Sequence, residues 1–292
     1  MTRRRVIGVT LLLLFLPASF IVGVVASGWL LAAPHQRVVG SAPPDLGADD
    51  VVFPSPSGSA IHGWLAPGEP GRGAVLVLHG IRADRGEMVT RLRLLHAAGF
   101  GLLAIDLQAR GESPGLHITF GHLEALDAAA AVAFLKERLP GERIGVIGVS
   151  LGGAATLLGL RPLAVDALVL EQVFPDIDSA LTNRLVAYIG PVGRWVARVY
   201  EWLMPLMLPI RPEQLRPIDH IGDITAPLLM LAGAEDRYTP LSESRALFAR
   251  AAEPKQLVEI AGAGHVDLAA HAPEDYRRRV LSFLAEYLSR RD

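Results

Sequence analysis

Continuous apolar runs alternate with helical segments along the chain from about residue 50 to the C-terminus. Apolar runs of about four to eight residues are typical of strands that are buried on both faces of a parallel sheet. The expected strands are 50–53, 60–65, 74–78, 101–105, 143–149, 165–170, 227–232 and 257–260. The expected helices are 87–98, 123–139, 151–160, 241–252 and 273–288. This alternation predicts an α/β fold with a mostly parallel central sheet and helices on both faces.

One stretch, from 173 to about 217, interrupts this alternation. It holds Trp195, Tyr200 and Trp202 together with several prolines. In open α/β sheets, ligands bind beyond the carboxyl ends of the strands. We therefore expect this stretch to form a short helical cap over that edge of the sheet, inserted into a domain that spans 49–292.

The composition excludes several classes of function. The chain has 28 basic and 30 acidic residues, so it lacks the positive charge needed to hold a nucleic-acid backbone. It has no cysteine, which excludes a thiol nucleophile, a disulfide and a thiolate metal site.

An uncharged apolar run from 6 to 33 follows three arginines at 3–5. As a helix the run would be ~42 Å long, which exceeds the ~30 Å core of a bilayer. This pattern predicts an N-terminal transmembrane helix within a membrane anchor at 1–34, followed by a linker at 35–48. The arginines would stay cytoplasmic and place the rest of the chain on the other side. The alternative is a cleaved signal peptide and a secreted protein, but its apolar core is usually only ~7–15 residues long.

The pattern Gly-x-Ser-x-Gly occurs twice, around Ser113 and around Ser150. A nucleophilic serine of this pattern needs a strand before it, a helix after it, and a backbone N–H on the next residue. Ser113 is followed by Pro114, which has no N–H. Ser150 follows the expected strand 143–149, and Leu151 opens a helix. The pattern favours Ser150 as the nucleophile, with a helix N-cap as the alternative role.

Five segments together resemble the α/β-hydrolase family, over about residues 50–290. The resemblance is to serine hydrolases of its peptidase-like and esterase-like branch, which have short caps. The segments are Leu78-His79-Gly80, Asp106-Leu107-Gln108-Ala109-Arg110-Gly111-Glu112-Ser113, Gly148-Val149-Ser150-Leu151-Gly152-Gly153, Gly233-Ala234-Glu235-Asp236 and Gly262-Ala263-Gly264-His265.

A serine hydroxyl needs a histidine to take its proton and a carboxylate to orient that histidine. The resemblance implies the chain order serine, acid, histidine. His265, in a glycine-rich loop after the last strand, fits the place of the base, and His271 is its nearest rival. Asp236 follows an expected strand and fits the place of the acid, with Glu171 as the alternative.

The resemblance also implies two backbone donors for an oxyanion, the N–H groups of Ile81 and Leu151. Arg82 stands beside this loop. We interpret it as a solvent-facing arginine, with a contact to an anionic substrate group as the alternative. Arg110 stands where relatives often carry histidine, which can alter the charge of the loop and the preference for substrate.

These features predict a serine hydrolase that cleaves a carboxylic ester or thioester through an acyl-enzyme, with an amide or peptide bond as the alternative. The apolar cap favours a small hydrophobic acyl substrate. No metal is expected, because His79 has no second histidine at metal-binding spacing. No cofactor is expected either, because residues 74–82 carry no glycine-rich nucleotide-binding motif. The sequence does not identify a protein partner. Two other functions remain open, an acyltransferase with the same triad and a non-catalytic, membrane-held binding protein on a hydrolase fold.

Overall fold

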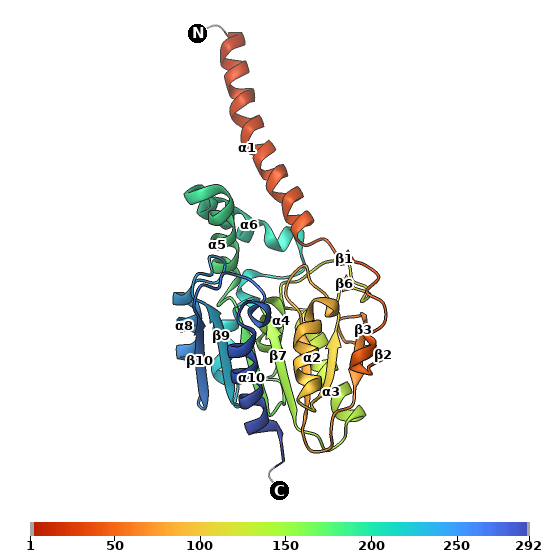
Figure 1. Cartoon of the computed structure of the whole chain (residues 1–292). Coiled ribbons are helices and arrows are strands. Elements are labelled where there is room, and N and C mark those ends of the chain that lie inside the picture. The colour runs from red at the N-terminus through yellow and green to blue at the C-terminus, as the bar shows by residue number, and fades with distance from the viewer. Residues whose placement is uncertain (1–2, 291–292) are drawn as a thin grey trace.

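The computed structural model describes residues 3–290, with side chains from residue 15 onward except for Pro17. Its centre is an eight-stranded sheet in the order β10-β9-β8-β7-β4-β5-β3-β2 (Figure 1). The strands are β2 (Asp49–Pro54), β3 (Ala60–Ala66), β4 (Ala74–Leu78), β5 (Gly101–Ile105), β7 (Ile144–Val149), β8 (Ala167–Glu171), β9 (Leu228–Gly233) and β10 (Lys255–Ile260).

The sheet is parallel except at one edge. β2 and β3 form an antiparallel hairpin, and β3 pairs antiparallel with β5. All other neighbouring strands run parallel. Every residue of β4, β5, β8 and β9 is buried, as expected for strands covered on both faces. The predicted α/β fold with a mostly parallel sheet is confirmed.

Helices pack on both faces of the sheet and create two separate hydrophobic clusters. On one face lie α2 (Val89–Ala97), α9 (Leu268–His271) and α10 (Pro273–Leu288). On the other face lie α3 (Glu124–Arg138), α4 (Leu151–Leu157) and α8 (Leu241–Arg250). α4 ends three residues before the predicted boundary, because Gly159 and Pro162 follow it and disfavour a longer helix.

The segment expected to be a linker packs against the body of the domain. Its β1 (His35–Gln36) pairs in parallel with β6 (Arg110–Gly111), and Leu46 of the 3₁₀ helix η1 (Pro44–Leu46) is buried. The indole N–H of Trp64 donates to the carbonyl of Gly40 over 3.1 Å. Short pairings of this kind carry no periodic signal in the sequence, and we did not predict them.

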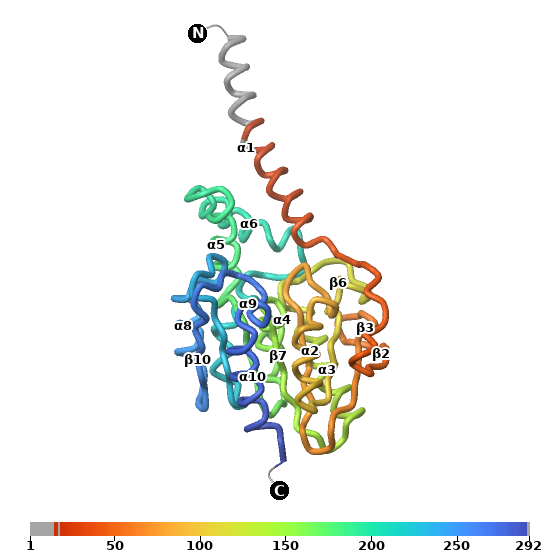
Figure 2. The backbone as a smooth tube through the Cα atoms, in the orientation of Figure 1, coloured from red at the N-terminus to blue at the C-terminus, as the bar shows by residue number. Residues whose placement is uncertain are grey.

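The chain begins with α1 (Arg3–Leu31), which projects away from the sheet (Figures 1 and 2). We expected a transmembrane helix here, and the structure does not support it: no helix among the described residues is long and apolar enough to cross a membrane. The part of α1 whose side chains are described starts at Phe15, and it is shorter than the roughly 20 residues that a span requires. The first half of the expected span lies outside those residues.

A helical pair lies over the carboxyl edge of the sheet, and α1 contacts the second helix of this pair (Figure 1). This pair consists of α5 (Ile177–Ile189) and α6 (Gly193–Met207), and it occupies the place where we expected the cap. Asp176 caps α5 by accepting from the N–H of Ser179 over 2.8 Å. The buried residues of α6 recur every three or four positions, which gives it one apolar face; they are Gly193, Ala197, Tyr200, Leu203, Met204 and Met207.

Candidate active site

Ser150 occupies the sharp turn between β7 and α4. Its backbone has φ 49° and ψ −107°, a conformation that residues other than glycine rarely adopt. The neighbouring glycines allow the turn to be this tight. A Cβ on Gly152 would lie 2.6 Å from the carbonyl oxygen of Leu78, and one on Gly148 would lie 2.6 Å from the Cα of Gly153. The sequence motif thus reflects close backbone contacts around a strained serine.

Asp236 and His265 are joined by a hydrogen bond of 2.7 Å between Oδ2 of the carboxylate and Nδ1 of the imidazole. They lie on the loops after β9 and β10, two neighbouring strands. Asp236 also accepts from the N–H groups of Tyr238 and Thr239, at 2.7 and 2.9 Å, and from the hydroxyl of Thr239 at 2.6 Å. Burial opposes ionisation of Asp236, yet the bonds from His265 and Thr239 hold its pKa below the ordinary value.

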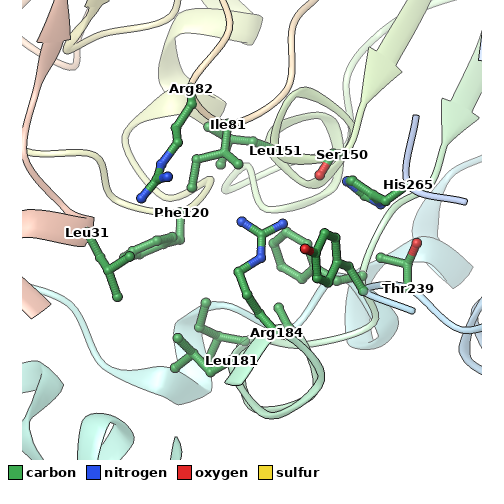
Figure 3. Close-up of a pocket in the computed structure, with 14 residues that line it drawn as sticks. Leu31, Ile81, Arg82, Phe120, Ser150, Leu151, Leu181, Arg184, Thr239 and His265 are labelled. Carbon is green, nitrogen blue, oxygen red and sulfur yellow. The ribbon is translucent and has the colours of Figure 1, made fainter. Parts of the chain in front are cut away.

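Ser150 and His265 line the same pocket, and Figure 3 shows the Ser150 hydroxyl directed toward the His265 ring. The two side chains make no hydrogen bond in this structure. Such bonds are often long before substrate binds, and they tighten in the reacting complex. Because Nδ1 of His265 is bonded to Asp236, Nε2 is the nitrogen that remains for Ser150.

The two expected oxyanion donors lie close to Ser150. Leu151 is the first residue of α4, so its N–H has no acceptor within the helix. Ile81 lies in the loop after β4, and both residues line the pocket beside Ser150. This loop approaches the turn at Ser150 closely, since a Cβ on Gly80 would lie 3.7 Å from the Cβ of Ser150.

The alternative serine, Ser113, is fully buried away from the pocket. Its hydroxyl donates to the carbonyl of Asp106 over 2.7 Å and accepts from the N–H of His62 over 2.9 Å. These two bonds tie the loop that follows β5 to β3. The hydroxyl has a structural role and no access to a substrate.

The alternative acid, Glu171, is also fully buried and already bonded. It accepts from Nε and Nη2 of Arg91 at 3.1 and 2.6 Å, and from the hydroxyl of Tyr276 at 2.6 Å. The alternative base, His271, is exposed and lies outside the pocket. The structure therefore brings neither of these side chains to the Ser150 hydroxyl.

His79 is buried inside the fold. Its Nδ1 donates to the carbonyl of Gly80 over 2.7 Å, and its Nε2 accepts from the N–H of Leu107 over 3.0 Å. Burial lowers its pKa, so the neutral ring is favoured. In the part of the chain that the structure describes, no group of three or more His, Asp or Glu side chains could hold a metal ion.

The pocket encloses about 710 Å³, part of it open to solvent. Its wall away from the catalytic loops is mostly apolar and comes from several elements that the sequence did not connect. Leu31 comes from the end of α1, Phe120 from the loop before α3, and Leu181 and Arg184 from α5. Figure 3 shows these four side chains directed into one space.

Gln172 is a further residue of the site that sequence reasoning missed. It directly follows β8 and has φ 52°. Its amide donates to Oδ2 of Asp236 over 3.2 Å and to the carbonyl of Gly264 over 2.6 Å. It thereby connects the loop of the acid to the loop of the histidine. Its position directly after a buried strand next to β7 is the one signal that could have marked it.

Comparisons with known proteins agree with this fold. The alpha/beta hydrolase family matches residues 75–279. An uncharacterised protein of Mycobacterium tuberculosis is 35% identical over 272 residues, which cover 86% of this chain and 88% of that protein. The alpha/beta hydrolase domain-containing protein WAV2 of Arabidopsis thaliana is 27% identical, over 82% of this chain and 79% of its own.

Among solved structures, the esterase Pf2001 of Pyrococcus furiosus is similar with a TM-score of 0.73 and 25% identity. The similarity covers 89% of this chain and 99% of that one. An esterase of Exiguobacterium antarcticum shares the fold with a TM-score of 0.60 at 15% identity, over 81% of this chain and 99% of its own. The order of the sheet, the turn at Ser150 and these matches all indicate the same family: the chain belongs to the alpha/beta hydrolase family.

Proposed function

We propose that this protein hydrolyses carboxylic esters through Ser150, His265 and Asp236. The observation that carries the proposal is the 2.7 Å bond from Asp236 to His265, in the pocket that also contains the strained Ser150. A serine on such a turn, a histidine held by a carboxylate and two backbone donors are the parts that acyl transfer requires. The similarity to the esterase Pf2001 supports the same reaction class.

In the first half of the reaction, the hydroxyl of Ser150 attacks the ester carbonyl while Nε2 of His265 takes its proton. Asp236 holds the ring in the required orientation and stabilises the imidazolium. The N–H groups of Ile81 and Leu151 accommodate the developing oxyanion, and one such donor is typically worth about 2.7–4 kcal/mol. His265 returns the proton to the departing alcohol, which leaves an acyl group on Ser150.

In the second half, His265 takes a proton from water, which attacks the acyl-enzyme. The carboxylic acid departs and Ser150 recovers its proton, so the net change is ester plus water to acid plus alcohol. A thioester would react by the same steps. The apolar side chains of Leu31, Phe120 and Leu181 favour a substrate with a hydrocarbon part.

The proposal is tested by measuring the hydrolysis of 4-nitrophenyl butyrate by the full chain. We expect wild type to be active and Ser150→Ala to lose at least about 10³-fold in kcat, as in other serine hydrolases. Ser113→Ala is the matched control, since this serine lies in the same five-residue pattern outside the pocket. Thermal unfolding of each variant shows whether it is folded. Loss of activity in folded Ser113→Ala with retention in Ser150→Ala would refute the assignment.

A further inference from the structure

Two arginines reach into the pocket from different elements. Arg82 comes from the loop after β4, and Arg184 comes from the middle of α5. Figure 3 shows the Arg184 guanidinium in the space between the Leu31–Phe120 side of the pocket and the Ser150–His265 side, and the Arg82 guanidinium near Phe120. Arg82 is exposed, as we interpreted it from the sequence, and its side chain also lines the pocket.

Neither arginine has an acidic partner among the described residues. No Asp or Glu lines the pocket, and neither guanidinium makes an ion pair. Other arginines of this chain are paired, as Arg85 is with Asp106 and Arg91 with Glu171. Asp236, the acid of the proposed triad, is bonded to His265. Two guanidinium groups without an acidic partner therefore line one pocket, and their charges attract an anion that enters it.

One arginine has a contact that holds it at the pocket, and the other lies on a strained backbone. The Arg184 guanidinium lies over the ring of Tyr238, 4.6 Å from its centroid, which is a cation–π contact. Arg82 has φ 61°, in the left-handed region. Ser150 and Phe120, which also line the pocket, have φ 49° and 53°. Backbone strain of this kind tends to occur at active sites and at sites that hold ligands.

A third cation adds to the positive potential near Arg82. Arg110 is 2% exposed, makes no ion pair within the described residues, and leaves its Nε without a hydrogen-bond partner there. Burial lowers its pKa to about 10; Glu124 opposes this change, and the charge of Arg82 adds to it. Glu124 accepts hydrogen bonds from Thr119, Gly121 and Gln108, which take up much of its capacity to neutralise Arg110.

We propose that the substrate carries an anionic group, a carboxylate or a phosphate monoester, which Arg82 and Arg184 bind. The inference rests on the proposed ester hydrolysis and specifies its substrate class. The hydrocarbon part of the substrate packs on Leu31, Phe120 and Leu181, and the ester carbonyl lies at Ser150. A guanidinium suits this role because its fixed donors match the oxygens of a carboxylate or phosphate.

The test compares two esters of equal shape in the full-length protein. Mono-4-nitrophenyl glutarate ends in a carboxylate, and 4-nitrophenyl 5-methylhexanoate has an isopropyl group in its place. The readout is the ratio of their kcat/KM values within each variant. We expect wild type to prefer the glutarate, and Arg82→Gln and Arg184→Gln each to lower the ratio about tenfold, the size of a charge-assisted hydrogen bond. Arg161→Gln, an exposed arginine outside the pocket, should retain the wild-type ratio.

Inhibition of the hydrolysis of the neutral ester distinguishes binding of a carboxylate from binding of a phosphate. This test also does not depend on whether the acyl part or the alcohol part of the substrate bears the charge. Hexyl phosphate, hexanoate and hexan-1-ol are compared as competitive inhibitors. We expect one or both anions to inhibit at least about tenfold more strongly than the alcohol in wild type, and this advantage to disappear when both arginines are replaced by glutamine. The anion that inhibits more strongly identifies the anionic group of the substrate.

The proposal is overturned if neither the ester ratio nor the advantage of the anions depends on the two arginines. Failure of the underlying function has a different signature. Wild type would then hydrolyse neither ester, and a serine-directed phosphonate would not label Ser150.

Discussion

The two walls of the pocket are held in place by different interactions. The wall that contains Ser150, Asp236 and His265 comes from loops at the ends of sheet strands, and short hydrogen bonds and close backbone contacts fix it. The opposite wall comes from α1, α5 and the loop before α3. Apolar packing and a few polar contacts hold the helices of this wall, such as the hydrogen bond from Asn183 of α5 to Glu243 of α8. The first wall is suited to chemistry that tolerates no displacement, and the second to adjustment of substrate preference.

The largest effect should come from the catalytic wall, in Asp236→Asn. The amide cannot stabilise an imidazolium and favours the wrong tautomer of His265, so we expect kcat to fall about 10⁴-fold. Steady-state hydrolysis of 4-nitrophenyl butyrate measures this loss. A decrease of less than tenfold in a folded protein would show that another group orients His265.

A second substitution tests whether the carboxylate of Glu171 is structural, in contrast to the catalytic carboxylate of Asp236. Glu171→Gln removes the charge that Arg91 faces, at a site where both side chains are almost fully buried. Breaking a buried ion pair typically costs about 3–5 kcal/mol, and Asp267, 2.8 Å from Arg91, should reduce that cost. Urea unfolding measures the loss of stability. We expect the folded variant to retain its kcat; a loss comparable to that of Asp236→Asn would make Glu171 the acid.

A smaller effect should come from the helical wall, in Leu31→Ala. The shorter side chain leaves a gap beside the hydrocarbon part of the substrate, so kcat/KM for long acyl chains should fall up to about tenfold, and for acetate much less. A series of 4-nitrophenyl esters of increasing length measures the change. Leu30→Ala is the control, because Leu30 is 75% exposed and does not line the pocket. Equal changes in kcat/KM for the two variants would show that α1 does not form part of the pocket wall.

The smallest effect is a dependence of stability on pH through Asp236. Its bonds from His265 and Thr239 outweigh burial and hold its pKa below the ordinary value. A carboxyl with a lowered pKa in the folded state stabilises the fold above its unfolded pKa, about 3.9, and this contribution disappears as the pH falls through the folded pKa. The difference in unfolding free energy between wild type and Asp236→Asn should therefore shrink from about pH 5 to about pH 2. A difference that stays constant over this range would contradict the assigned pKa.

The same contrast explains what could be predicted from the sequence. Strands such as β4 and β5 match the expected ranges because a buried parallel strand leaves a continuous apolar run. The motif around Ser150 could be interpreted because its glycines serve local backbone contacts. Arg184 and Leu31 could not be assigned to the pocket, because their positions depend on how α5 and α1 pack. Long-range packing of this kind has no signature in local sequence.

The expected transmembrane helix illustrates a related limit. Composition alone suggested a span at 6–33, yet the described part of α1 packs partly on the domain. Val24 and Ala32 are buried in the same cluster as Tyr200 and Met207 of α6. Apolar residues of one helix serve a bilayer and a protein surface equally well, so composition cannot distinguish them.

The most direct test of the central claim is covalent labelling with a serine-directed fluorophosphonate, followed by intact mass measurement and peptide mapping. The account predicts one phosphonate per chain on Ser150, no labelling of Ser150→Ala, and greatly slowed labelling of Asp236→Asn. Ser113→Ala should be labelled as wild type is, since its hydroxyl is buried and bonded to backbone. A folded wild type that remains unlabelled, or a label that maps to any serine other than Ser150, would contradict the account.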